Sequence, residues 1–363
     1  MLRLYYSDIC IFLPFILNFL IYWTFFFKIN FFTVQQTLIF TDKIEFSNSI
    51  RNIHYIFFIK LNQIFLVFMY LYLYVYRGQV ETIWWNHFKL SNLSLNLISL
   101  LLIVNFFFLY IVKTLSLNSG VYKIDYFFAL INLSNFLPII FLSNTLFTFL
   151  FILEVNSSLV FYKFVVSKFW YNDNNLVNIN NYLFKRLLPK NYLNMLFFQY
   201  WATFFSSVMI MYTLISYMYL YGSTEWIILN LLNEISIKLV YHYNYSNNII
   251  LSAVLLFAFL IKIGFTPVQL YKIEVYKGLP YIAIFFYTTY YFLVFFLFFI
   301  LILVYYFNSF LVYWWYLIIL IIVFGGFYIL SLLFDVNYIK AFFAYSTMIN
   351  SLGFICIAFS LLL

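Results

Sequence analysis

The sequence predicts an all-α protein that crosses a membrane with about ten hydrophobic helices. Hydrophobic residues make up 66% of the 363 residues and charged residues only 8%, whereas a soluble domain carries roughly 25% charged residues. In lipid, only helices and closed barrels satisfy the backbone hydrogen bonds. The apolar runs lack the alternation of barrel strands and reach the roughly 20 residues of a spanning helix. We therefore expect one polytopic helical domain without an embedded soluble domain.

Apolar runs mark the expected helices in order along the chain. They cover residues 9–29, 53–76, 95–113, 126–143, 146–167, 192–221, 249–270, 280–306, 311–333 and 339–362. The intervening segments contain charged residues or asparagine, which predicts polar loops. These loops are expected at residues 30–52, 77–94, 114–125, 168–191 and 223–248.

The basic residues predict how the helices are oriented. Two of the 19 lysines and arginines, Lys60 and Lys262, lie well inside apolar runs rather than near their ends. Thirteen others fall on one side of the ten-helix arrangement, and four, Arg3, Arg77, Lys89 and Lys238, fall on the other. The basic side is expected to face the matrix or cytoplasm, with both termini on the opposite side. The net charge of +8 is thus attributed to membrane topology, and nucleic-acid binding is not expected.

Cysteine and histidine usage argues against a metal or redox centre in this chain. Cys10 and Cys356 lie in apolar runs, without a CxxC motif or a Cys/His cluster, so we interpret both as packing residues. His54, His87 and His242 lie in or beside loops and are expected to be solvated. Phosphate-loop, dinucleotide, nucleophile-elbow and HExxH motifs are also lacking, so we expect no cofactor and no metal in this chain.

Three ionisable residues, Lys60, Glu154 and Lys262, lie well inside apolar runs. A charge at the bilayer centre costs about 3 kcal/mol on the insertion scale, so each needs a partner, water or access to the interface. Glu154 is followed by the polar residues 156–158, which predicts a hydrated lining. Lys60 lies near the start of its helix and is expected to extend toward the interface.

Lys262 precedes an expected break in its helix. Pro267 removes a backbone hydrogen bond and clashes with the carbonyl of residue 263, and Gly264 weakens the helix further. A charged residue beside a broken helix is how transporters build ion sites at membrane depth. We expect movement or neutralisation of Glu154 to switch Lys262 between holding and releasing a proton. The alternative is a static Glu–Lys pair that only joins two helices.

Residues 262–280 resemble the antiporter-like membrane subunits of respiratory complex I, most closely the NADH dehydrogenase subunit 2 family. The shared pattern is Lys262, a proline five residues later, and a Tyr-x-Gly-x-Pro turn that begins at Tyr276. Residues 125–155, 219–223 and 338–349 also match in order and spacing. The resemblance covers about residues 122–363, whereas the first three helices agree only in number.

The resemblance implies an antiporter-like fold of two inverted five-helix repeats. It predicts three N-terminal helices over residues 1–120, a complete first repeat over 121–308, and the start of a second repeat over 309–363. Glu154 and Lys262 fall on the glutamate and lysine of the family's proton path. Pro267, Gly278, Pro280 and Lys340 fall on structural positions.

The chain departs from the family at three polar positions. The family's lysine in the eighth helix is Phe292 here, a lysine in the sixth is Asn194, and a histidine in the tenth is Asn350. The sequence ends at Leu363, within the second repeat. We expect a separate chain to supply the remaining helices.

By this resemblance, we expect a core membrane-arm subunit of mitochondrial NADH:ubiquinone oxidoreductase that takes part in proton translocation. NADH, FMN, iron–sulfur clusters and ubiquinone would be bound by other subunits. Expected partners are those subunits and lipids such as cardiolipin in the mitochondrial inner membrane. The 52 Phe and 36 Tyr suggest an AT-rich, organelle-encoded gene. The alternatives are a non-conducting structural subunit of the same arm and a free-standing monovalent cation/proton antiporter.

Overall fold

A computed structural model describes most of the chain and is all-α in the described part, apart from one short hairpin. The described residues are 20, 44–75, 80–119, 124–167, 182–238, 244–264, 270–306, 308–334, 336 and 338–362. Apart from residue 20, the predicted helix at 9–29 lies outside them. The helical segments long and apolar enough to cross a membrane are Asn92–Ile111, Leu146–Val166, Asn191–Tyr221, Tyr281–Val304 and Ile339–Ile357. By these segments, the chain is a multi-pass membrane protein.

The described helices follow the predicted apolar runs closely. They are α2 (Ile44–Val75), α3 (Asn92–Ser119), α4 (Ile124–Phe136), α5 (Leu146–Val166), α7 (Tyr182–Tyr221), α9 (Asn244–Ile263), α11 (Tyr281–Phe286), α12 (Phe292–Tyr306), α13 (Asn308–Leu333) and α14 (Ile339–Leu362). A 3-10 helix, η1 (Leu137–Leu142), continues α4, and a π-helix, η3 (Tyr287–Tyr291), joins α11 to α12.

The predicted loops were partly wrong. Residues 77–94 contain an antiparallel hairpin of β1 (Glu81–Ile83) and β2 (Phe88–Leu90). Residues 223–248 contain the helix α8 (Trp226–Lys238). Helices α2 and α7 begin within the expected loops 30–52 and 168–191. The run 249–270 is not one helix, because α9 ends at Ile263 and a new helix, α10 (Leu270–Gly278), begins at its end.

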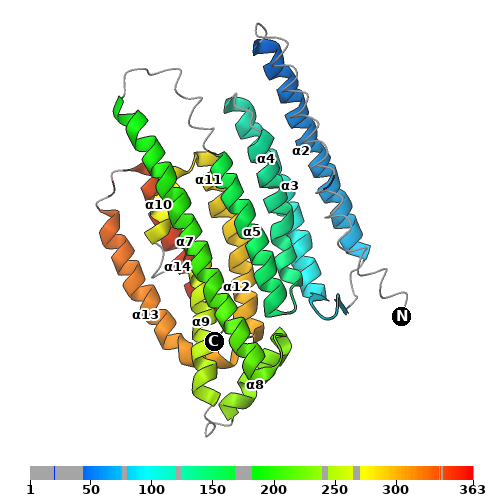
Figure 1. The fold of residues 1–363 in the computed structure, drawn as a ribbon, viewed down its shortest axis with the longest axis vertical. Coiled ribbons are helices and arrows are strands. Elements are labelled where there is room, and N and C mark those ends of the chain that lie inside the picture. The colour runs from blue at the N-terminus through cyan, green and yellow to red at the C-terminus, as the bar shows by residue number, and fades with distance from the viewer. Residues whose placement is uncertain are drawn as a thin grey trace. The chain divides into compact units, whose positions relative to one another are not determined.

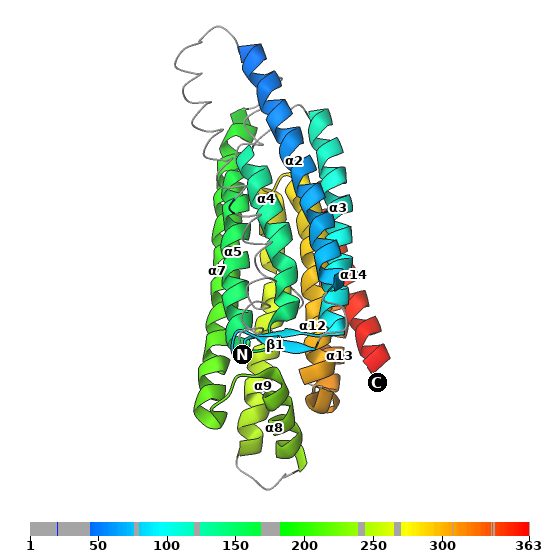
Figure 2. The same ribbon diagram turned by 90° about the vertical axis from the view of Figure 1, so that its right-hand side faces the viewer.

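The chain divides into two compact units, Met1–Ser143 and Asn144–Leu363. The boundaries implied by the resemblance, after residues 120 and 308, stay predictions. In the first unit α2, α3 and α4 lie side by side (Figure 2). Buried asparagines join the three helices: Asn135 Nδ2 donates to Asn62 Oδ1, and Asn105 Nδ2 donates to Asn135 Oδ1, both at 3.2 Å. Such bonds hold helices together where burial of apolar surface gives little driving force.

In the second unit, backbone hydrogen bonds tie the start of α5 to the start of α8. Leu146 N donates to Thr224 O at 2.9 Å, and Trp226 N donates to Asn144 O at 3.1 Å. Thr145 caps α5, since its hydroxyl accepts from Thr148 N at 3.2 Å. These bonds satisfy groups that helix ends otherwise leave without partners.

An aromatic cluster holds the middle of the second unit. The Phe149 ring of α5 stacks on Phe298 of α12 with centroids 4.8 Å apart and lies 5.1 Å from Phe259 of α9. The long helix α7 packs against α5, α9 and α10, and α10 also packs against α14 (Figure 1). This arrangement brings α9, α10, α12 and α14 together at one site.

Candidate functional site

Lys262 lies in the last turn of α9 and is buried, with 3% of its surface exposed. Its Nζ has no hydrogen-bond partner in the described part of the chain. A buried ammonium without a partner is costly in an apolar interior. The arrangement is typical of a functional group.

Glu154, which the sequence placed among apolar residues, is exposed on the surface of α5. The Ser157 hydroxyl lies 3.4 Å from Glu154 Oε2. The carboxylate is within electrostatic range of Lys262, yet no hydrogen bond or ion pair joins these two described residues. The static pair considered from the sequence is therefore not present. Lys60 is likewise exposed, on α2.

Helix α9 ends at Ile263, and the next residue, Gly264, has the left-handed φ of +73°. Gly264 N donates to Leu260 O at 2.9 Å, and the Tyr271 hydroxyl donates to Ile261 O at 2.8 Å. Ile261 O also accepts from Gly264 N at 3.0 Å, so a tyrosine of α10 adds a second donor to this carbonyl at the end of α9. Gly264, expected only to weaken the helix, is the residue that ends it. Pro267 lies outside the described residues.

The turn between α10 and α11 is held by the predicted structural residues. A Cβ on Gly278 would lie 2.4 Å from Met195 Cβ of α7, so only glycine permits this approach. Pro280 occupies the N-cap of α11 with φ −70°. Lys340 Nζ of α14 donates to Leu279 O at 2.7 Å. Side chains of α7 and α14 therefore fix where α10 ends.

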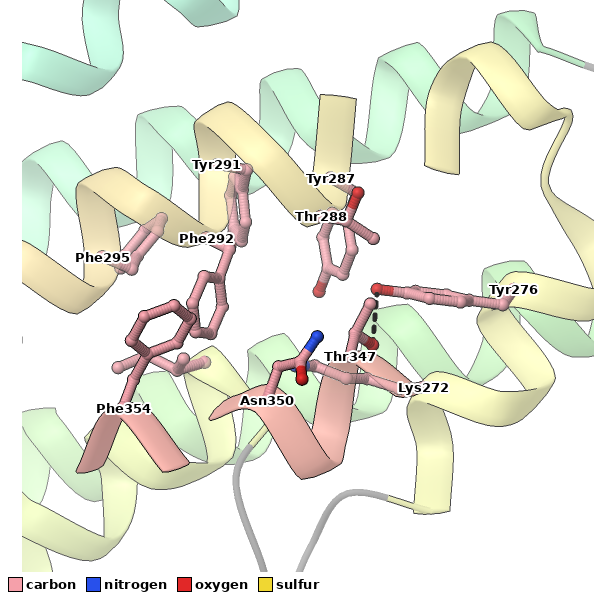
Figure 3. Close-up of a pocket in the computed structure, with 11 residues that line it drawn as sticks. Lys272, Tyr276, Tyr287, Thr288, Tyr291, Phe292, Phe295, Thr347, Asn350 and Phe354 are labelled. Atoms are coloured by element: carbon pink, nitrogen blue, oxygen red, sulfur yellow. Dashed lines mark hydrogen bonds between the residues drawn. The ribbon is translucent and has the colours of Figure 1, made fainter. Parts of the chain in front are cut away.

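A cavity of about 110 Å³ lies between α10, η3, α12 and α14. Ile263, the residue that follows Lys262 in the sequence, is part of its lining. Figure 3 shows its lining. The lining residues are Ile263, Lys272, Tyr276, Tyr287, Thr288, Tyr291, Phe292, Phe295, Thr347, Asn350 and Phe354. A water molecule needs about 10–15 Å³ of such volume, so the cavity has room for several. Its hydroxyl and amide groups supply the polar partners that buried water requires.

One wall of the cavity is the π-helix η3. Tyr287, Thr288 and Tyr291 line the cavity from this single widened turn. Across from it, the Thr347 hydroxyl lies 3.4 Å from the Tyr276 hydroxyl. Single π-turns within α-helices are frequent at functional sites.

Lys272 is the lysine of the cavity lining, and it was not predicted from the sequence as a candidate site residue. It was counted among the cations on the basic side of the membrane, but its side chain is buried, with 3% exposed. Its Nζ lies 5.8 Å from the ring centre of Phe292. Lys163, counted in the same way, is buried on α5 with its Nζ 3.4 Å from the Phe286 ring centre. Phe292 occupies the position of a lysine in the family that the sequence resembles. This substitution was the sequence signal that could have prompted a search for a lysine on another helix.

Phe292 and Asn350, two of the three positions at which the sequence departs from the family that it resembles, both line this cavity, whereas Asn194 does not.

Within the described residues no group of three His, Cys, Asp or Glu side chains is placed to hold a metal ion. Cys356 is an exposed free thiol, and Cys10 lies outside the described part.

Comparison with known proteins gives one partial match. A stretch of 77 residues is 34% identical to the uncharacterized mitochondrial protein ORF4 of Paramecium tetraurelia, covering 21% of this chain and 49% of that protein. The chain therefore spans about half the length of this relative. No protein-family model matches the chain.

Proposed function

We propose that this chain is a core membrane-arm subunit of mitochondrial NADH:ubiquinone oxidoreductase and takes part in proton translocation. Lys262 is the proton carrier and Glu154 its electrostatic modulator. Other subunits hold the redox cofactors. The inner mitochondrial membrane is the proposed location, in keeping with the mitochondrial protein that the chain matches.

The observation that carries the proposal is the buried Lys262, whose Nζ has no hydrogen-bond partner among the described residues. The next residue, Ile263, lines a cavity that also holds hydroxyl and amide groups. A proton carrier in a membrane needs a titratable side chain out of bulk water and a hydrated path from it. The interrupted helix α9–α10 supports the same role, since broken helices line ion sites in transporters. Exposure of Glu154 lets a neighbouring subunit act on its charge and, through it, on Lys262.

A non-conducting structural role is the second candidate, and Phe292 is the observation that favours it. An aromatic ring at this position carries no proton. In that case the subunit would join its neighbours, and the lysines would serve packing alone.

Proton pumping per NADH oxidised separates the two candidates. In inverted inner-membrane vesicles, Lys262→Met should lower the ratio of protons to NADH because a thioether cannot bind a proton, while NADH oxidation continues. Lys60→Met removes an exposed lysine of α2 and should leave the ratio unchanged. An unchanged ratio in Lys262→Met would support the structural role. Absence of the chain from the NADH-oxidising assembly, tested by native electrophoresis and mass spectrometry, would overturn both.

A further inference from the structure

The geometry points to Lys272 as a second proton-carrying group, which supplies from α10 the cation that Phe292 does not provide from α12. This inference rests on the proposed function and names the next step of the same path. In this step the ammonium of Lys272 passes its proton to a cavity water, which leaves a neutral amine. A proton arriving from the Lys262 side then restores the ammonium.

The first argument is the position of the Lys272 ammonium. Phe292 lies halfway along the spanning segment Tyr281–Val304, and Lys272 Nζ lies 5.8 Å from its ring centre. The ammonium is therefore at membrane depth, where a charge is tolerated mainly at functional or hydrated sites. A lysine stem can often carry its charge out to the interface, yet this one ends in the cavity (Figure 3).

The second argument is that the backbone is shaped to admit the Lys272 stem. A Cβ on Gly264 would lie 2.2 Å from Lys272 Cε and 2.9 Å from Lys272 Cδ. The stem therefore crosses directly over the glycine that ends α9, two residues after Lys262. One glycine thus serves both the break beside Lys262 and the entry of Lys272 into the cavity.

The third argument is the chemistry that faces the ammonium. Tyr276 on its own helix, Tyr287 and Tyr291 on η3, and Thr347 and Asn350 on α14 line the cavity, and no carboxylate is among the lining residues. Among the described residues, no carboxylate forms an ion pair with Lys272. Such a lysine is not held in one charge state by a fixed anion and can exchange its proton with water.

Lys277 provides a matched control on the same helix. It lies one and a half turns from Lys272, is part-exposed, and pairs with Glu274 at 2.6 Å. Its neighbour is thus a surface carboxylate, and it does not line the cavity. Lys277→Met should leave proton pumping unchanged, although it removes the same charge from the same helix.

The experiment measures protons pumped per NADH in vesicles that hold the assembled complex, with Lys262→Met alongside. Lys272→Met should lower the ratio as far as Lys262→Met does. Adding Phe292→Lys to Lys272→Met should restore at least half of the loss, because the new ammonium enters the same cavity from the opposite wall. Lys272→Arg should also lower the ratio, since arginine keeps its charge but does not release its proton.

The outcomes separate this inference from the proposed function. Normal pumping in Lys272→Met with a loss in Lys262→Met would overturn the role of Lys272 and leave the proposed function standing. Normal pumping in both would overturn the proposed function. If Lys272→Met does not accumulate in the membrane, Lys272→Arg decides: full pumping with arginine overturns the inference, and lost pumping in an assembled complex supports it.

Discussion

At the scale of single residues, the backbone of Gly264 and the side-chain stem of Lys272 pack directly against each other. An L-residue at the left-handed φ of Gly264 costs about 1–2 kcal/mol, and any Cβ there would also displace the Lys272 stem. The end of α9 and the direction of Lys272 are therefore coupled, and a change at residue 264 should move both.

We predict that Gly264→Ala destabilises the protein by about 1–2 kcal/mol from backbone strain alone, and by more once the Lys272 stem is displaced. Thermal unfolding of the solubilised protein, followed by tryptophan fluorescence, measures the change. Gly353→Ala is the control, since Gly353 lies in α14 and its added Cβ would meet nothing within 4 Å. Equal midpoints for the two variants would show that the stem does not cross Gly264.

The sequence predicted Lys262, but not Lys272, as a candidate site residue, and the sequence around each lysine explains the difference. Lys262 interrupts a long apolar run, so its burial follows from the cost of charge in lipid. Lys272 stands next to Tyr271 and near Glu274, in a stretch that has the polarity of a loop. The exposure of Glu154 was not predictable, because the polar residues of α5 are not confined to one side of the helix and its sequence therefore marks no buried face.

At the scale of elements, the apolar runs predicted the long helices well and the short elements poorly. A run of about twenty apolar residues has few alternatives to a spanning helix. Helix α8 contains asparagine and Glu234, yet Trp226 and Leu229 are buried. The hairpin turn places Trp84, Trp85 and Asn86 at positive φ, a conformation that asparagine accepts but bulky tryptophan disfavours. Tertiary packing thus decides both elements.

The aromatic cluster is the element-scale feature whose loss should cost most. We predict that Phe149→Ala destabilises the protein by about 3–5 kcal/mol, the usual cost of removing a buried phenylalanine, because Phe149 contacts Phe259, Phe298 and Trp226 at once. The thermal unfolding midpoint of the solubilised protein measures the effect. Phe151→Ala on the same helix should change it little, since that ring is 62% exposed. Similar losses for both would place the stabilising contacts outside this cluster.

At the scale of the whole molecule, the topology depends on whether α4 and η1 cross the membrane together. Thirteen α-helical residues and six 3-10 residues rise about 1.5 and 2.0 Å each. They reach roughly 32 Å, slightly more than the hydrocarbon core of about 30 Å. Pro138 lies at the start of η1, where its missing N–H removes a helical hydrogen bond and favours the change of helix type.

We predict that a cysteine at Lys89 and a cysteine at Lys185 lie on opposite sides of the membrane. The segments between them are α3, α4 with η1, and α5, so three crossings separate the two positions. Each single cysteine is introduced with Cys10 and Cys356 changed to serine, and labelled with an impermeant maleimide in mitoplasts and in inverted vesicles. The cysteine at Lys89 should react in mitoplasts, and the one at Lys185 in inverted vesicles.

A cysteine at Lys238, the last residue of α8, serves as the control in the same experiment. One further crossing, α7, separates Lys185 from Lys238, so a cysteine at Lys238 should react together with that at Lys89. If α4 and η1 did not cross, only two crossings would separate Lys89 from Lys185, and both would label from one side. The predicted asymmetry of the basic residues would then no longer hold, and the proposed proton path from Lys262 to the cavity would need a different orientation in the membrane.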